Sequence, residues 1–385
     1  MTIRPFAAVR PNAMDAALVA SVPYDVLSQA EADVIKAANP KSFLNVSLPA
    51  TPAEGRAVLD KFRSEGTLIK EDAPSFYAYR QIMGSHSQTG IVATFATADY
   101  RSGVIKQHEK TRKDKEDDRT HHIEVMGAQT GPAFLTYRDD PAIDLIVADT
   151  CRNTTPLYDF TADDGIRHTV WKIGTATACA CDELVELFAR IKTAFIADGH
   201  HRSAAATRYA AAHPESTESQ YFLATIFPAS QLKILAYNRL VKDLNGLTPA
   251  EFLAKLSQLG ILDSESGSRS CRMYFEGKWH TLAWNLTTDD PVARLDVAYL
   301  QDHVLAPILG IGDPRTDKRI SFVGGIRGDE ALSSAVDSGS AAVAFAMNPV
   351  TVEEMMAIAD AGAIMPPKST WFEPKLRSGL FLHEV

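Results

Sequence analysis

The strongest constraint on this fold is a strand, a glycine turn and a helix encoded in immediate succession. An apolar run at residues 194–197 leads into Asp198 and Gly199, and an alanine-rich segment at residues 203–212 follows. This order predicts a β-strand that passes through a tight turn into an α-helix. The first N–H groups of a helix lack acceptors within the helix and lie at the positive end of its dipole. The turn is therefore a candidate anion site.

This prediction is supported by the three residues after the glycine, which are His200, His201 and Arg202. A cation in the first turn opposes the helix dipole, so Arg202 is mildly unfavourable there, and protonated histidines would add to the repulsion. A bound anion reverses the sign of each of these interactions. The alternative is an ordinary turn whose polar side chains face water, because short motifs often occur by chance.

Composition limits the ligands that such a turn could hold. The 385 residues are enough for two or three packed units, and the formal net charge is −9 with a pI near 5.7. We therefore expect no nucleic-acid partner, because broad binding to phosphate backbones needs a basic surface. A local basic pocket for a small anion is compatible with this charge. The sequence has no signal peptide and no apolar run of membrane-helix length, which predicts a cytoplasmic protein without a membrane partner.

The four cysteines, at positions 151, 179, 181 and 271, match no zinc pattern and form no disulfide framework. Cys179 and Cys181 are either a metal or redox pair or two small buried thiols. The second explanation is favoured, because free cysteines are commonly buried as small apolar residues.

Helix and strand patterns are mixed along the whole chain. The expected helices lie at residues 53–64, 182–192, 248–259 and 295–305, and the expected strands at residues 75–81, 90–96, 273–275 and 279–284. The pattern changes after Asp243. We predict an α+β (mixed α/β) fold with two lobes, residues 1–240 and residues 241–385. The first lobe carries the glycine turn, and the terminal segment of the second lobe returns to it.

A second candidate site lies in the charged segment at residues 106–124, which contains His108, Glu109, Lys110 and Arg119. One explanation is a solvated helix crossed by ion pairs. The other is a functional site, because histidine, carboxylate and basic side chains together bind phosphate and move protons. In that case Glu109 beside His108 is a candidate general base.

Two further segments are candidates for the walls of a site. Residues 365–375 contain three prolines and two adjacent aromatic residues, which predicts a rigid segment that presents Lys368. Simple docking of the chain terminus is the alternative. Tyr24 and Asp25 follow a proline near the N-terminus, where they either line a pocket or form a structural turn.

Five motifs in a fixed order are typical of one protein family. They are Pro5-Phe6, Pro23-Tyr24-Asp25-Val26, His108-Glu109-Lys110-Thr111, Ala197-Asp198-Gly199-His200-His201-Arg202 and Met365-Pro366-Pro367-Lys368-Ser369-Thr370. Over essentially its full length the chain resembles the domain-of-unknown-function 1015 family. It departs from the pattern at Asn238, where we expect a histidine, and in residues 112–119, which lack a proline and a glycine. The first departure removes a candidate acid–base group, and the second implies a loop of different shape.

The Asp-Gly-His-x-Arg turn is also similar to the phosphate-binding turn of the ParB/sulfiredoxin-like superfamily, over about twenty residues. That superfamily includes nucleotide-hydrolysing partition proteins, sulfiredoxins and kinases that act on free serine. In those proteins a Gly-x-x-Arg turn at a helix N-terminus holds nucleotide phosphates. The resemblance implies a ParB/sulfiredoxin-like nucleotide-binding core in this chain, and a shared site more than a shared substrate.

These resemblances lead us to predict a nucleotide-dependent kinase that phosphorylates a small hydroxyl metabolite such as free L-serine, with ATP or ADP and Mg²⁺ as cofactors. The residues assigned to the nucleotide phosphates are Gly199, His200, His201, Arg202, Lys110, Arg119 and Lys368. Asp198 or Glu109 would take the acceptor's proton or hold Mg²⁺, and His108 is a further catalytic candidate. Tyr24 and Asp25 are assigned to the acceptor pocket.

Two alternatives to a kinase stay open. One is a metal-dependent hydrolase or lyase, with ligands drawn from His108, Glu109, Asp198, His200 and His201. The other is a nucleotide-binding regulatory protein without catalysis. The sequence also leaves the oligomeric state open, a homodimer included.

Overall fold

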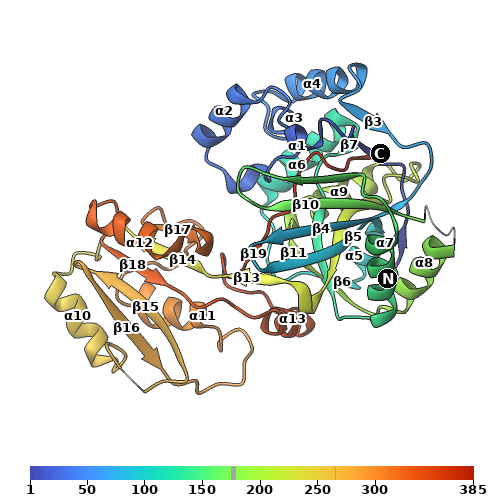
Figure 1. The fold of residues 1–385 in the computed structure, drawn as a ribbon. Coiled ribbons are helices and arrows are strands. Elements are labelled where there is room, and N and C mark those ends of the chain that lie inside the picture. The colour runs from blue at the N-terminus through green and yellow to red at the C-terminus, as the bar shows by residue number, and fades with distance from the viewer. Residues whose placement is uncertain (175–178, 265) are drawn as a thin grey trace. The chain divides into compact units, whose positions relative to one another are not determined.

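The computed structural model describes residues 1–174, 179–264 and 266–385, which divide into two compact units (Figure 1). The first unit comprises Met1–Leu232 and Pro374–Val385, and the second comprises Lys233–Glu373. Both units combine helices with β-sheets, which confirms the predicted mixed α/β fold class. Within the described residues, no helix has the length and apolarity needed to cross a membrane.

A nine-stranded mixed sheet forms the centre of the first unit. Its strands are β1 (Ile3–Arg4), β4 (Phe76–Met83), β5 (His86–Ala96), β6 (Ile105–Lys106), β8 (Ala133–Tyr137), β9 (Tyr158–Thr161), β10 (Arg167–Ile173), β11 (Ala194–Asp198) and β12 (Tyr221–Pro228). The order is β6-β11-β8-β12-β5-β4-β10-β9, and β1 pairs with β5. The pairs β11–β6 and β12–β8 are parallel and the other pairs are antiparallel. Strands β4 and β5 confirm the strands expected at residues 75–81 and 90–96.

Helices pack against this sheet and enclose a smaller core beside it. They are α1 (Ala16–Val19), α2 (Gln29–Ala38), α3 (Leu44–Ser47), α4 (Pro52–Ser64), α5 (Thr97–Arg101), α6 (Lys113–Met126), α7 (Pro141–Asn153), α8 (Cys179–Arg190) and α9 (His200–Ala212), with short turns η1 (Tyr24–Val26) and η2 (Ala229–Gln231). Ile143 of α7, Phe188 of α8 and Ala205 of α9 lie in the core of the large sheet. Phe43 and Leu59 lie in the smaller core, beside the paired strands β2 (Val9–Pro11) and β3 (Leu68–Lys70).

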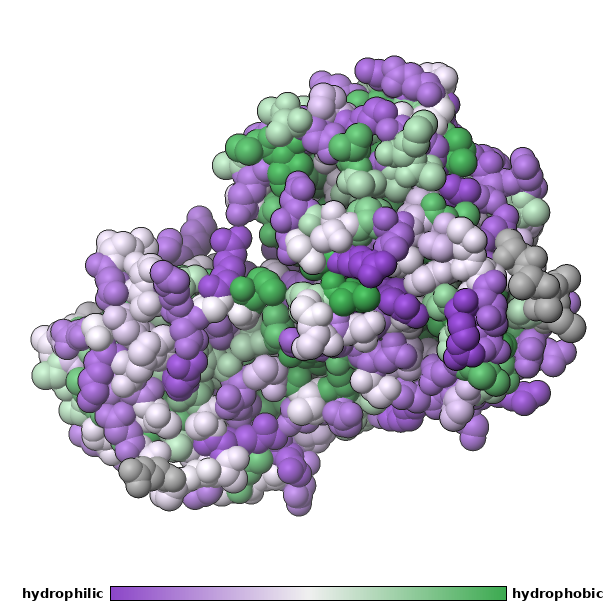
Figure 2. Space-filling view, viewed as in Figure 1, coloured by the Kyte–Doolittle hydropathy of each residue, from purple (hydrophilic) through white to green (hydrophobic). Residues whose placement is uncertain are grey.

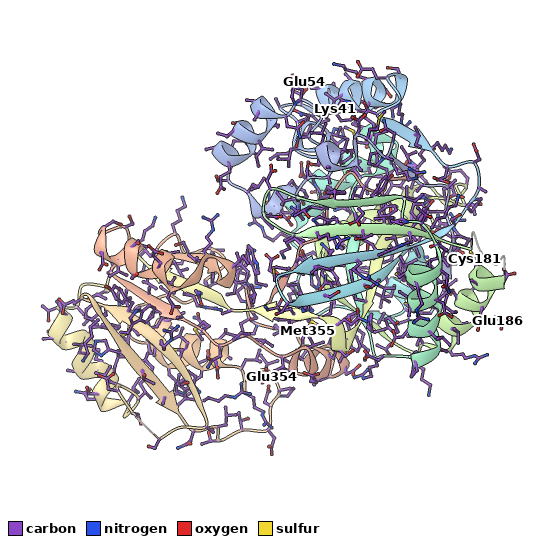
Figure 3. The ribbon with its side chains drawn as sticks, in the orientation of Figure 1. Lys41, Glu54, Cys181, Glu186, Glu354 and Met355 are labelled. Atoms are coloured by element: carbon purple, nitrogen blue, oxygen red, sulfur yellow. The ribbon has the colours of Figure 1, made fainter. Side chains whose placement is uncertain are left out.

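Local sequence explains where several of these helices begin. The Thr51 side chain accepts the N–H of Glu54 and Pro52 takes the first position of α4, so the expected helix at residues 53–64 is confirmed. Helix α8 confirms the helix expected at residues 182–192, and Figure 3 shows Cys181 and Glu186 on it. The Cys181 thiol is half-buried and donates to the carbonyl of Ile173 at 3.7 Å. The side chain of Cys179 lies outside the described part of the chain, so the predicted thiol pair stays a prediction.

The second unit is built on a five-stranded antiparallel sheet in the order β16-β15-β18-β14-β17. Its strands are β14 (Tyr237–Val241), β15 (Arg269–Phe275), β16 (Lys278–Trp284), β17 (Ile320–Gly324) and β18 (Val343–Ala346), and a separate pair joins β13 (Lys233–Leu235) to β19 (Trp371–Glu373). The hairpin expected between β15 and β16 is confirmed. Its two turn residues, Glu276 and Gly277, have φ values of 46° and 77°, as a two-residue turn of this twist requires.

Four α-helices and two short turns complete the described part of the second unit. They are α10 (Pro249–Gln258), α11 (Asp296–Leu300), α12 (Gly328–Asp337) and α13 (Val352–Asp360), with a π-helical turn η3 (Gln301–Leu305) and a 3₁₀ turn η4 (Gly325–Arg327). Helix α10 and the pair α11–η3 confirm the helices expected at residues 248–259 and 295–305. Glu354, labelled on α13 in Figure 3, pairs with Arg269 of β15.

Hydrophilic side chains cover much of the surface on the face that Figure 2 shows, and apolar side chains appear there in small groups. The most exposed large apolar side chains in the first unit are Met14, Val34 and Leu145. Scattered residues of this kind are normal on protein surfaces.

Candidate functional site

The glycine turn has the structure that its sequence predicts. Strand β11 ends at Asp198, Gly199 has φ 87°, and α9 begins at His200. Arg202 is therefore the third residue of the helix. A Cβ atom at position 199 would lie 3.1 Å from the guanidinium carbon of Arg202 and 3.2 Å from Cα of Ala133. Both the backbone conformation and the close approach of Arg202 therefore favour glycine.

Asp198 accepts two hydrogen bonds and lies near a second cation. Its Oδ1 accepts the N–H of Gly199 at 2.8 Å, and its Oδ2 lies 3.1 Å from Nζ of Lys375 and 3.7 Å from Nη2 of Arg202. Burial alone would raise the pKa of Asp198, but Lys375 and Arg202 hold it well below its usual range. A carboxylate with so low a pKa is a weak proton acceptor. This favours an electrostatic role for Asp198 over the role of general base.

His108 and His200, which belong to two different sequence motifs, contact each other through their rings. The rings of His108 and His200 lie perpendicular to each other with their centroids 4.6 Å apart, and both side chains are buried. Burial lowers the pKa of His108 to about 4 and that of His200 well below its ordinary value. Both rings are therefore neutral at pH 7, and they add no positive charge to the helix N-terminus. His201 accepts the N–H of Arg112 on Nε2 at 3.1 Å, which joins α9 to the start of α6.

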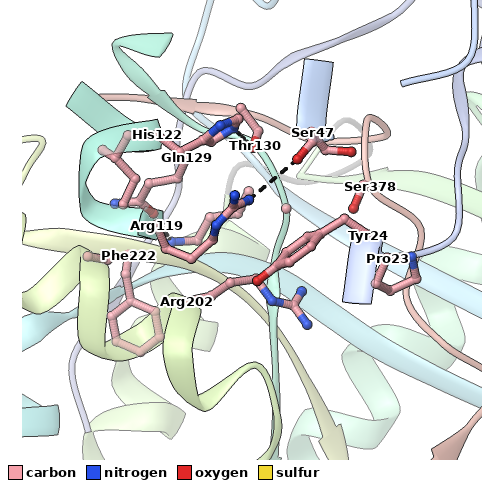
Figure 4. A pocket seen from close by; sticks show the side chains of 14 residues that line it. Pro23, Tyr24, Ser47, Arg119, His122, Gln129, Thr130, Arg202, Phe222 and Ser378 are labelled. Carbon is pink, nitrogen blue, oxygen red and sulfur yellow. Dashed lines mark hydrogen bonds between the residues drawn. The ribbon is translucent and has the colours of Figure 1, made fainter. Parts of the chain in front are cut away.

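A cavity of about 550 Å³, counting the space that opens to solvent, lies beside the turn (Figure 4). Its lining residues are Pro23, Tyr24, Ser47, Arg119, His122, Ile123, Gln129, Thr130, Gly131, Arg202, Ala206, Phe222, Leu223 and Ser378. Three residues that the sequence assigned to one site, Tyr24, Arg119 and Arg202, thus line the same cavity. They come from η1, α6 and α9, far apart in the chain.

The two cavity arginines have different surroundings. The Arg119 guanidinium lies 4.2 Å from the Tyr24 ring centroid, and Nη2 lies 2.7 Å from Oδ2 of Asp118, an exposed carboxylate. Arg202 donates to the carbonyl of Pro132 and approaches Asp198 only at 3.7 Å. An anion in the cavity would therefore meet one stacked and one partly paired guanidinium, a combination that suits phosphate.

Several cavity residues escaped the sequence analysis. His122 lies on α6, with Nε2 3.1 Å from Oγ1 of Thr130, and burial lowers its pKa to about 4. Ser378 lines the cavity, and Lys375, which does not line it, pairs with Asp198; both come from the end of the chain, which belongs to the first unit. Lys375 is the last residue of the run at residues 365–375 that the sequence analysis identified. A lysine directly after a proline was the local signal that could have pointed to it.

Other predicted residues lie outside this cavity. The described lining residues do not include the following predicted site residues: Gly199, His200, His201, Asp198, His108, Glu109, Lys110 and Asp25. Glu109 and Lys110 precede α6 in a loop, where Glu109 is half-buried and Lys110 is exposed. Asp25 is exposed at the turn that carries Tyr24. Their assigned roles stay predictions.

Lys368 belongs to the second unit and has φ 56°. Its carbonyl accepts Nη2 of the buried Arg239 at 3.2 Å, and its Nζ lies 5.4 Å from the Tyr237 ring centroid. The neighbouring Asn238, where a histidine was expected, accepts the N–H of Met347 at 3.0 Å. Asn238 therefore joins two segments of the second unit, and the predicted phosphate contact of Lys368 stays a prediction.

The metal-ligand set of the hydrolase alternative is not assembled. In the parts of the chain that the structure describes, no three His, Cys, Asp or Glu side chains are grouped so that they could hold a metal ion. His108 and His200 contact each other through their rings, and Asp198 is engaged by two cations. These contacts are those of a packed, charge-balanced turn, and they do not resemble a shell of ligands around an ion.

Comparison with known proteins identifies the family. The family model for proteins of unknown function DUF1015 matches residues 3–298, so the chain belongs to this family. No curated protein is similar enough to the chain to count as a match. The sequence-level recognition of the family is thereby confirmed.

Three solved structures are similar at low identity. A free serine kinase in complex with AMP is 13% identical with a TM-score of 0.39, covering 75% of this chain and 91% of its own. A conserved hypothetical protein from Pyrococcus furiosus is 14% identical with a TM-score of 0.37, covering 75% and 94%. SbnI with a C-terminal truncation, from Staphylococcus aureus, is 12% identical with a TM-score of 0.40, covering 73% and 82%. Likeness at this level decides nothing about the chemistry of the cavity.

Proposed function

We propose that the cavity beside the glycine turn binds the phosphate groups of ATP or ADP, and that the protein transfers a phosphoryl group to a small hydroxyl metabolite such as free L-serine. The observation that carries the proposal is the presence of Arg119 and Arg202 in one cavity, with Arg202 in the first turn of α9. Two guanidinium groups, one of them carried by the first turn of a helix, are suited to bind an anion. The volume, about 550 Å³, lies within the roughly 300–1,000 Å³ of small-ligand pockets.

The remaining lining supports a nucleotide over a bare anion. Ile123, Phe222 and Leu223 give the cavity an apolar wall that suits a base, while Thr130 and Ser378 offer hydroxyl groups. Phosphoryl transfer depends mainly on positioning and on neutralising charge, which arginine side chains supply. The division into an apolar and a cationic part therefore matches the two ends of a nucleotide.

Proton transfer and metal binding fall to other residues in this proposal. Glu109 is the better candidate base, because the pKa of Asp198 lies well below its usual range in its pairing with Lys375 and Arg202. Mg²⁺ would neutralise charge on the phosphates. It keeps several waters and needs only one or two protein carboxylates; Asp198 or Glu109 would have to supply them from outside the cavity, because none of the described lining residues is a carboxylate.

A nucleotide-binding regulator without catalysis is the second candidate. It is favoured by the same low pKa, because the carboxylate closest to Arg202 is a poor proton acceptor. The two candidates differ in their products. A kinase forms a phosphorylated metabolite, whereas a regulator binds the nucleotide and leaves it unchanged.

Titration calorimetry with ADP, ATP and CTP in the presence of Mg²⁺ tests the binding step. Arg202→Ala is expected to weaken binding by about tenfold or more, the value of a hydrogen bond to a charged group. Arg167→Ala is the control, because Arg167 is exposed and pairs with Asp159 outside the cavity. The proposal is wrong if none of the three nucleotides binds or if Arg202→Ala binds as well as the wild type.

Phosphorus NMR then separates the two candidates. The protein is incubated with the nucleotide that binds and with a panel of small alcohols that includes L-serine. A new phosphomonoester signal supports the kinase. Tight nucleotide binding with no such product for any acceptor supports the regulator.

A further inference from the structure

The C-terminal strap, Pro374 to Ser378, is fixed at one end by two buried glutamines of the large sheet. Gln81 of β4 donates from Nε2 to the carbonyl of Lys375 at 2.8 Å, and Gln88 of β5 donates to Oε1 of Gln81 at 3.0 Å. Both glutamines are fully buried. Buried amides with satisfied partners are costly to disturb, so the backbone of Lys375 has a defined position.

The other end of the strap is fixed by a second buried network. Arg377 donates from Nε to Nε2 of His168 at 3.1 Å, and the Tyr79 hydroxyl lies 2.8 Å from Nδ1 of the same ring. Ser378 exchanges two backbone hydrogen bonds with Ser21, of 2.8 and 3.1 Å. Ser378 also lines the cavity, so the strap supplies both a cavity wall and the cation beside Asp198.

The charges at the turn are unevenly shared. Oδ2 of Asp198 lies closer to Lys375, at 3.1 Å, than to Arg202, at 3.7 Å. Arg202 lines the cavity, whereas Lys375 is not among the described lining residues. Asp198 is thus engaged mainly by Lys375, outside the cavity. Arg202, inside the cavity, is less closely paired with Asp198, so its positive charge can act on a ligand.

We propose that Lys375 is a positioning residue: by engaging Asp198 it prevents a close ion pair between Asp198 and Arg202, and so leaves Arg202 able to bind the phosphate of the ligand. The inference rests on the proposed function in one respect, that the ligand of the cavity carries phosphate. Without Lys375, the carboxylate would have Arg202 as its nearest cation. The pair would then compete with the ligand, and the turn would lose one positive charge.

Calorimetry with inorganic pyrophosphate and with ADP, each with Mg²⁺, tests this inference on the full chain. Lys375→Met is expected to weaken the binding of pyrophosphate by about tenfold or more. The double variant Asp198→Asn/Lys375→Met removes one charge of each sign and restores the net charge of the turn. It is expected to bind within about threefold of the wild type. A structural role for Lys375 alone would produce no such rescue.

Two further variants control for folding and for charge. Lys375→Arg keeps the cation and is expected to bind as the wild type does. Lys41→Met removes another lysine–aspartate pair, Lys41 with Asp15 at 2.6 Å, from a part of the first unit outside the cavity lining (Figure 3). It is expected to leave pyrophosphate binding unchanged. If Lys375→Met does not fold, the double variant and Lys375→Arg carry the comparison, because both must bind about as well as the wild type.

The outcomes separate this inference from the proposed function. Unchanged pyrophosphate binding in Lys375→Met, or a double variant as weak as the single one, overturns the role of Lys375. Binding of pyrophosphate without binding of ADP or ATP overturns the nucleotide proposal and leaves the role of Lys375 intact. A wild-type protein that binds none of these ligands overturns both.

Discussion

Acid should destabilise the first unit steeply between pH 7 and pH 5. Five of its histidines are buried: His108, His122, His168, His200 and His383. Burial lowers the pKa of His108, His122 and His383 to about 4, that of His168 to about 3, and that of His200 well below its ordinary value. Each ring must therefore take up a proton when the unit unfolds at acidic pH, and that uptake favours the unfolded chain.

The sign and size of the effect follow from the two pKa values. A histidine in an unfolded chain titrates near about 6.5, so between about pH 6.5 and pH 4 the unfolded state binds more protons and stability falls as the pH falls. For a folded pKa of about 4 the loss at pH 5 is about 2 kcal/mol per histidine, or about 8 kcal/mol for the four whose pKa is about 3 or 4. Folded domains have only about 5–15 kcal/mol in total, so the first unit should be close to unfolding at pH 5.

Urea unfolding at pH 7, 6 and 5 measures this dependence, with the fluorescence of Trp171, buried on β10, as the signal from the first unit. His168→Gln should flatten the dependence by about one proton, because it removes one buried titrating ring. His121→Gln is the matched control, since His121 is exposed on α6. Equal free energies of unfolding at pH 7 and pH 5 would refute the reasoning.

Two substitutions give further predictions. Gly199→Ala puts a side chain at φ 87° and 3.1 Å from the guanidinium of Arg202, so it should cost about 1–2 kcal/mol in urea unfolding and weaken ADP binding in calorimetry. Gly66→Ala, also at positive φ but with no atom within 4 Å, should lose stability without losing affinity. Asn238→Ala leaves the N–H of Met347 without its acceptor and should lower stability by about 1–3 kcal/mol, read by thermal unfolding.

Each of these predictions has an outcome that would contradict it. Unchanged ADP affinity in Gly199→Ala would mean that the position of Arg202 does not matter to the ligand. Loss of affinity in Gly66→Ala would show that affinity follows global stability. An unfolding temperature for Asn238→Ala equal to that of the wild type would mean that the hydrogen bond contributes nothing to the second unit.

Much of the secondary structure could be predicted from local sequence patterns. The turn at Gly199 and the hairpin at Glu276 could be predicted because their signals, a strand, a glycine and the next element, lie within a dozen or so residues of one another. The cavity could not be predicted in full, because its walls come from segments that only the folded sheet brings together. Lys368 and Lys375 follow prolines in the same run, and nothing local tells which of them belongs to the unit of the turn.

The charged segment shows that two opposing interpretations can both hold for one helix. Exposed ion pairs such as Arg112 with Asp114 fit the solvated helix. Arg119, His122 and Met126 lie at spacings of three and four residues, and this face of α6 turns inward, with His122 and Met126 buried. The helical period of these three residues was the signal that distinguishes the two faces, and the density of charge obscured it.

The charge balance of the turn is the physical reason to expect an anionic ligand. Arg119, Arg202 and Lys375 bring three cations to the cavity and its surroundings, and Asp118 and Asp198 bring two carboxylates. Asp118 is exposed, so water screens its pairing with Arg119 and the pair contributes little. The neutral histidines add no charge, and Arg202 lies in the first turn of α9, at the positive end of that helix. A phosphate-bearing ligand would turn the unfavourable position of Arg202 into a favourable one, and this is the physical basis of the proposed anion site.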